Sequence, residues 1–245
     1  MPTRKLIVSN YISPLDWLQD YQEYIPVEDT VIYSRTPEKY NEDYSHLGTY
    51  IKSPNVGENI YDILRHIIEN YDNLSDMNIF VKGNLFSRRK GGGSQPLPGE
   101  QYERDEFYYT TRENFVEALT TTDYYPITTW HPSSRSPRGT VYTANAHMNF
   151  CGSQQVGHRY FCHFHEMLKS HFENPPIRDT VSYPPGANYA VPKHVLLKYS
   201  KKLYEKLILY ISWVPDPPFI STCAEAYLLE RLLNFIWTEN LVEKK

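Results

Sequence analysis

The chain has 245 residues, of which 40% are hydrophobic and 22% charged, with a formal net charge of −4 and a pI near 6.1. This length is ample for a buried core, and a slightly acidic chain lacks the basic surplus of a nucleic-acid-binding protein. No apolar run approaches the roughly 20 residues that span a bilayer, and the first ten residues do not form a signal peptide. With only three cysteines, we expect a cytoplasmic protein.

The first third of the chain alternates strand and helix patterns. Short β-branched runs predict strands at 5–10, 30–34 and 78–82. Ser13 and Pro14 are placed to begin a short helix, and apolar residues at helical spacing predict a longer one from Asn59 to about Tyr71. This alternation is typical of α/β proteins with a parallel sheet.

The rest of the chain continues this pattern after a long irregular segment. Residues 87–106 contain three consecutive glycines and two prolines, which predicts a mobile loop. Beyond the loop we expect helices over 112–119, 158–172, 194–211 and 224–237, and strands over 126–130, 138–143 and 188–191. Without repeats or a shift in composition, we expect one α/β domain over 1–245, with a mostly parallel central sheet flanked by helices.

Polar residues follow three of the predicted strands. Ligands of open α/β sheets bind where strands end and helices begin, so Asn10, Tyr11, Arg35 and Asn84 are candidates for binding a nucleotide-sugar donor. Asn55 and Gly57 precede the long helix and are candidates too, although Gly57 could simply permit a turn that Asn55 caps. The basic stem Arg88, Arg89 and Lys90 begins the predicted loop, where it could clamp a diphosphate or remain solvated.

The last predicted helix carries the best candidate for a general base. A helical wheel places Glu225 on the apolar face with Leu229 and Leu232, and Glu230 nearly opposite. An inward carboxylate at a helix N-terminus could deprotonate an acceptor hydroxyl, or it could simply occupy the first turn, where acids are common. Tyrosines and tryptophans such as Trp130 could form an acceptor platform, since their rings stack on sugars, although tyrosine also fills strands.

The histidines and cysteines provide weaker signals. His163 and His165 point to different sides of a helix, and no zinc motif is present, so we expect no zinc site. Cys151 with a nearby histidine would be the centre of a hydrolase, which is the least supported alternative.

Three segments resemble a family known as a domain of unknown function. The matching residues are, loosely, 10–18; then Asn55-Val56-Gly57-Glu58, 69–76 and Phe80-Val81-Lys82-Gly83-Asn84; and last 227–232, Tyr-Leu-Leu-Glu-Arg-Leu. That family is similar to GT-A glycosyltransferases, which implies a nucleotide-sugar donor, a glycan acceptor and a metal-binding Asp-x-Asp. The family pattern also draws attention to Glu230 as a second catalytic candidate.

The chain departs from the GT-A pattern at the metal position, because Asn84 stands where the aspartate would be. An amide is a weaker ligand than a carboxylate for Mg2+ or Mn2+. Either transfer is metal-independent, or a displaced acid such as Asp105 binds the cation. The arginine that follows the family's Asn-Val-Gly is also missing. We therefore predict a glycosyltransferase, with a non-catalytic glycan-binding protein as the main alternative.

Overall fold

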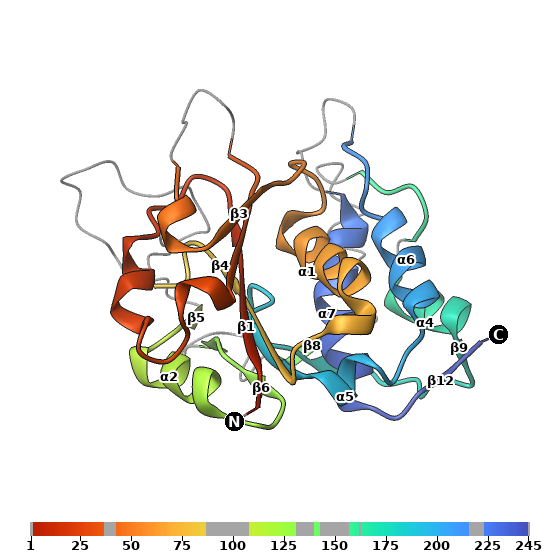
Figure 1. Ribbon diagram of the computed structural model, residues 1–245. Helices are drawn as coiled ribbons and strands as arrows, with labels where there is room; N and C mark the ends of the chain where they lie inside the picture. The colour runs from red at the N-terminus through yellow and green to blue at the C-terminus, as the bar shows by residue number, and fades with distance from the viewer. Residues whose placement is uncertain are drawn as a thin grey trace. The chain divides into compact units, whose positions relative to one another are not determined.

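The computed structural model describes residues 2–36, 43–86, 108–130, 140–142, 157–161, 163–215 and 223–244, with backbone alone at 108–109, 129–130 and 140–142 (Figure 1). The chain divides into two compact units, each assembled from separate segments. Unit 1 contains 1–55, 72–138 and 184–195, and unit 2 contains 56–71, 139–183 and 196–245. The expectation of one domain over the whole chain stays a prediction, and the predicted loop at 87–106 lies outside the described residues.

Unit 1 contains a six-stranded, mostly parallel sheet, as predicted. Its strand order is β3-β2-β1-β4-β11-β6. The parallel strands are β1 (Arg4–Asn10), β2 (Thr30–Ser34), β3 (Thr49–Lys52) and β4 (Met77–Lys82). β11 (Tyr189–Pro192) runs antiparallel to β4, and β6 (Tyr125–Pro126) antiparallel to β11. The chain is therefore of the α/β class.

The core of unit 1 follows from side-chain alternation along these strands. Leu6, Val8 and Val81 belong to one buried cluster with side chains of the 3-10 helix η1 (Asp16–Tyr21) and of α2 (Arg112–Thr120). Ile7 and Phe80, which alternate with them, are also at most 1% exposed. Burial on both faces explains why the central strands read as continuous apolar runs.

Unit 2 is mainly helical. Its long helices are α1 (Glu58–Glu69), α4 (Phe164–His171), α6 (Lys201–Leu209) and α7 (Ala224–Thr238). α1 packs against α6 and α7, and α4 packs against α7. Two short antiparallel pairs complete the unit: β8 (Thr140–Tyr142) with β10 (Thr180–Ser182), and β9 (Phe172–Glu173) with β12 (Val242–Glu243). None of the described helices is long and apolar enough to cross a membrane.

Three helix predictions need correction. The helix expected after Ser13 is η1, whose N-cap is Leu15 without a side-chain cap. The helix expected over 158–172 begins only at Phe164. The helix expected over 194–211 is two helices, α5 (Lys193–Leu196) and α6, because the Ser200 side chain accepts a hydrogen bond from the Leu203 N–H and starts α6 afresh.

The strand predictions differ from the structure at several places, and the short strands β9, β10 and β12 of unit 2 were not predicted. The expected strand 126–130 is two short strands: β6, and β7 (Thr129–Trp130), which pairs with β5 (Tyr108–Tyr109) outside the large sheet. β3 was not predicted, since its four residues, two exposed and two half-buried, lack an apolar run. The remaining short elements are the 3-10 helices η2 (Val27–Asp29), η4 (Ser45–Leu47) and η5 (Tyr71–Asn73).

Candidate functional site

The strand order of unit 1 reverses at β1. β2 and β3 lie on one side of β1 and β4 lies on the other, so the carboxyl ends of β1 and β4 meet at the reversal. The Arg35 N–H donates to the Asn10 carbonyl at 2.8 Å, and the Gly83 N–H donates to the Ser9 carbonyl at 2.9 Å. The carboxyl ends of β1, β2 and β4 therefore share one edge. In open α/β sheets this point of reversal is the usual ligand site.

The two strand ends approach each other closely at Asn10 and Gly83. A Cβ on Gly83 would lie 2.3 Å from Asn10 Oδ1, so only glycine fits there. The Asn10 side chain is 1% exposed, and its amide closes a turn by accepting from the Ser13 N–H and donating to the Ser13 carbonyl, both at 3.1 Å. Trp17 Nε1 donates to the Gly83 carbonyl at 3.0 Å. If the Asn10 amide bound a nucleotide-sugar donor, as predicted, that contact would compete with the hydrogen bonds that close this turn.

A chain of buried polar groups extends this edge across β11 and β6. Asn188, 4% exposed, accepts from the Lys82 N–H through Oδ1 and donates through Nδ2 to the Thr128 hydroxyl, both at 2.8 Å. The Thr128 hydroxyl lies 3.0 Å from that of Thr110. A satisfied buried network of this kind fixes the edge in one geometry. Sequence reasoning missed it, since the three residues meet only through the strand order.

The residues that end the parallel strands are basic or neutral. Lys52 and Lys82 end β3 and β4, and Arg35, 8% exposed, follows β2. No aspartate or glutamate occurs in the strand-end segments 9–13, 34–36, 52–55 and 82–86. Amides and hydroxyls are weaker ligands than carboxylates for Mg2+ or Mn2+, and lysine and arginine side chains repel these ions. These residues fit an anionic ligand.

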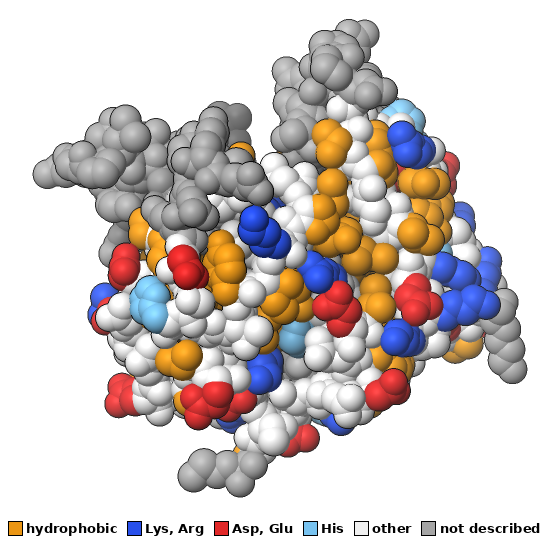
Figure 2. All heavy atoms as spheres, turned by 45° about the horizontal axis from the view of Figure 1, so that its top comes forward, with side chains coloured by type: hydrophobic (Ala, Val, Ile, Leu, Met, Phe, Trp, Pro, Cys, Tyr) orange, Lys and Arg blue, Asp and Glu red, His pale blue; other side chains and the backbone are white. Residues whose placement is uncertain are grey.

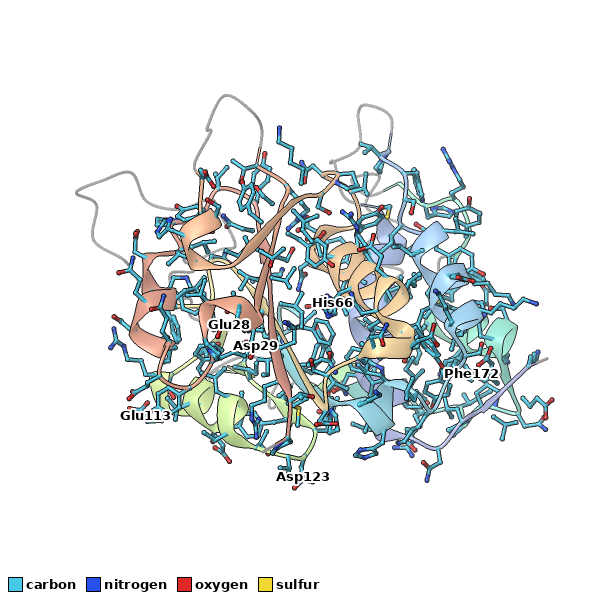
Figure 3. The ribbon with its side chains drawn as sticks, viewed as in Figure 1. Glu28, Asp29, His66, Glu113, Asp123 and Phe172 are labelled. Atoms are coloured by element: carbon cyan, nitrogen blue, oxygen red, sulfur yellow. The ribbon has the colours of Figure 1, made fainter. Side chains whose placement is uncertain are left out.

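The acids of unit 1 that flank strands lie at the opposite edge. Glu28 and Asp29 directly precede β2, and Asp123 precedes β6 (Figure 3). Both strands point the same way, so these acids lie at the amino edge of the sheet. The amino edge also carries Arg4 and Lys5, which begin β1, so charges of both signs occur there, whereas the described strand ends of the carboxyl edge carry cations and no acid.

The other residues of unit 1 that were predicted to bind the nucleotide-sugar are exposed to solvent to different extents. Tyr11 is 40% exposed, Asn55 is exposed, and Asn84 is half-buried. Tyr11 is thus the large ring at this edge that could stack on a base or sugar.

Glu225, in the first turn of α7, is fully buried, which confirms the inward orientation expected from the helical wheel. Its Oε1 accepts hydrogen bonds from the backbone N–H groups of Arg159 and Tyr160 at 2.7 Å and of Phe161 at 3.3 Å. Oε2 has no hydrogen-bond partner among the described residues. The carboxylate therefore anchors the 159–161 backbone, and its use as a general base stays a prediction.

Glu230 lies in a packed cluster of unit 2. Its side chain is 17% exposed, and its carboxylate oxygen is 3.9 Å from the guanidinium of Arg231. Arg231 lies over the Tyr183 ring at 4.7 Å and donates to the Tyr183 hydroxyl and the Tyr227 carbonyl. Burial raises the pKa of Tyr183 to about 12. These contacts give the Glu230-Arg231 pair a role in the packing of unit 2.

A comparison with known families shows which family the chain belongs to. The family model described as "Protein of unknown function (DUF3431)" matches residues 6–245. The chain belongs to this family. No curated protein and no solved structure matches it. The resemblance to a domain of unknown function is thus confirmed, and the similarity to GT-A transferases stays a prediction.

In this DUF3431 chain, the backbone conformation and close packing at position 57 explain why the residue is a glycine. It is the N-cap of α1 with φ +59°, a backbone conformation that favours glycine, and a Cβ would lie 2.8 Å from Ile211. No side chain caps the helix, so the alternative that Asn55 is its cap is wrong.

Several predicted residues of the DUF3431 chain lie outside the described residues: Arg88, Arg89, Lys90, Asp105 and Cys151. Of Trp130 only the backbone, in β7, is described. Among the described residues, no cluster of three or more histidines, cysteines or acids could hold a metal ion.

Proposed function

We propose that this DUF3431 chain is a glycosyltransferase that binds a nucleotide-sugar at the carboxyl edge of β1, β2 and β4 and works without a divalent cation. The observation that carries the proposal is the reversal of strand order at β1, next to the close contact of Asn10 with Gly83. The order 3-2-1-4 is that of nucleotide-binding α/β sheets, in which the ligand lies across this point.

The charges of unit 1 support an anionic donor. A diphosphate at the carboxyl edge would approach Lys52 and Lys82, and the exposed Tyr11 ring offers a face for the base or the sugar. The predicted clamp Arg88 to Lys90 lies outside the described residues.

The reaction follows from this donor. An acceptor hydroxyl oxygen attacks the anomeric carbon, the bond from that carbon to the diphosphate breaks, and the hydroxyl proton passes to a base. Glu225, in unit 2, is our candidate base from the sequence, and its Oε1 keeps the backbone of 159–161 in place.

The test is a thermal-shift screen with UDP-, GDP-, dTDP- and CMP-sugars, each with and without Mn2+. A ligand at 100 times its Kd stabilises a protein by about 2.7 kcal/mol, which a melting curve resolves. We expect one nucleotide to raise Tm equally in both conditions, and Lys82→Met to reduce the shift. Lys5→Met, at the amino edge of the sheet, is the matched control. A chain that responds to none of the four nucleotides is not this kind of transferase.

One observation favours a second candidate, a glycan-binding protein without catalysis. A carboxylate that is fully buried and holds three N–H groups is a poor base unless the site opens. This alternative predicts sugar binding without any nucleotide-dependent shift, so the same screen separates the two candidates.

A further inference from the structure

Unit 2 presents a set of aromatic rings on a short irregular segment and the end of α6. We call the set Arg159, Tyr160, Phe161, Tyr210 and Trp213 the aromatic surface. The rings of Tyr160 and Phe161 each lie 5.1 Å from that of Tyr210, and the guanidinium of Arg159 lies over the Trp213 ring at 4.5 Å. Trp213 Nε1 donates to the Tyr210 carbonyl at 2.8 Å, which fixes the indole beside the end of the helix. These contacts join the five residues into one group, with the link from Trp213 to Tyr210 made through the Tyr210 backbone.

The cluster is open to solvent on one side. Tyr160 is 49% exposed, Arg159 is exposed, and Phe161, Tyr210 and Trp213 are half-buried. Side chains of the hydrophobic class, which in this colouring contains tyrosine and tryptophan, reach the molecular surface among charged ones (Figure 2). Single exposed rings are common on protein surfaces. A packed group of rings that includes the exposed Tyr160, with Arg159 at its border, is instead a surface that can bind a ligand.

The backbone under this surface is held by a buried charge. Glu225 Oε1 accepts from the N–H groups of Arg159, Tyr160 and Phe161, and the Ala224 N–H donates to the Gly157 carbonyl at 2.9 Å. Burying a carboxylate costs free energy. Because the segment is exposed, water could hydrogen-bond the same N–H groups without a buried charge. Residues that support a binding surface in this way reduce the entropy lost on binding.

We propose that the aromatic surface binds an oligosaccharide. A pyranose has one flat C–H face that packs on an aromatic ring, and hydroxyls around its rim that need hydrogen-bond partners. The Tyr160 ring provides the platform, and the guanidinium of Arg159 and the tyrosine hydroxyls provide the polar partners. A neutral sugar fits better than a nucleic acid, because one arginine offers little charge for a phosphate backbone.

Oligosaccharide binding by this surface can be measured without the proposed transferase activity. Maltohexaose, cellohexaose and chitohexaose are each titrated into the full chain without nucleotide, with saturation-transfer NMR and calorimetry as readouts. We expect at least one to bind, about tenfold more weakly to Tyr160→Ala and nearly unchanged to Tyr160→Phe, as expected for loss of one stacking contact. Tyr24→Ala, which removes an exposed tyrosine of unit 1, is the control and should bind as the wild type does.

Two results would overturn the proposal: binding of none of the three oligosaccharides, or equal binding by Tyr160→Ala and the wild type. The nucleotide screen on the same variants separates this failure from that of the transferase. A Tm shift with a nucleotide but no oligosaccharide binding would refute the role of the aromatic surface and still support the donor site. Oligosaccharide binding that depends on Tyr160, without a Tm shift by any nucleotide, would support the aromatic surface and refute the transferase.

Discussion

Removing the Glu225 carboxylate should destabilise unit 2 and release the segment it anchors. In Glu225→Ala the N–H groups of Arg159 and Tyr160 each lose a 2.7 Å bond, and that of Phe161 loses a 3.3 Å bond. An unpaired buried donor costs about 1–3 kcal/mol, and a donor that water can reach costs less. Because Arg159 and Tyr160 are exposed residues, we expect a total loss of about 2–4 kcal/mol. Glu225→Gln keeps an acceptor oxygen and should lose only about 1 kcal/mol.

Two measurements check this prediction. Urea unfolding followed by circular dichroism gives the change in stability, and amide hydrogen exchange of the peptide around 159–161 gives the local effect. We expect protected amides in the wild type, near-wild-type protection in Glu225→Gln and fast exchange in Glu225→Ala. Glu166→Ala removes an exposed acid from the first turn of α4 and is the matched control, since it should change neither quantity.

The anchoring role would be refuted if Glu225→Ala had the unfolding midpoint and the exchange rates of the wild type. The base role is refuted separately. If a transferase activity is found, a folded Glu225→Gln variant that keeps the full transfer rate shows that the proton goes elsewhere, because an amide cannot accept it at neutral pH.

Three further predictions concern other buried groups. Gly83→Ala places a methyl group against the Asn10 side chain and should lower stability by about 1–3 kcal/mol in urea unfolding, whereas Asn84→Ala should lower it by less. Burial lowers the pKa of His171 to about 4 from 6.5, so its contribution to stability is present above pH 6.5 and lost as pH falls toward 4; the unfolding midpoint should fall less over that range in His171→Gln. Burial raises the pKa of the fully buried Cys223 thiol to about 12, so peptide mass spectrometry should find Cys223 alkylated by iodoacetamide at pH 8 only in denaturant.

The elements that the sequence predicted well are those with strong periodicity. The apolar runs of β1, β2 and β4 and the stripes of α1 and α7 are local patterns, and each element forms where its pattern lies. β3 lacks such a pattern, because its residues are mostly half-buried or exposed. Its place in the sheet comes from pairing with β2, which no local signal records.

The error over 158–172 has a nonlocal cause. A helix through Arg159 and Tyr160 would use their N–H groups within the helix or leave them at its first turn. Here Glu225, some 65 residues further along the chain, takes these N–H groups in an irregular segment instead. The helical wheel could place this carboxylate on the inner face of α7, but not name its partners.

The carboxyl edge of unit 1 shows how much of a site depends on topology. The glycine that follows β4 reads locally as a turn residue, and Asn10 reads as a polar strand end. Only the order β2-β1-β4 brings them together, 73 residues apart in the chain, and makes a glycine necessary. The same order places Lys82 beside β1 and sends Glu28, Asp29 and Asp123 to the other edge. The preference of this edge for an anion, and its poor fit to Mg2+, therefore arise from strand order together with the residue at each strand end.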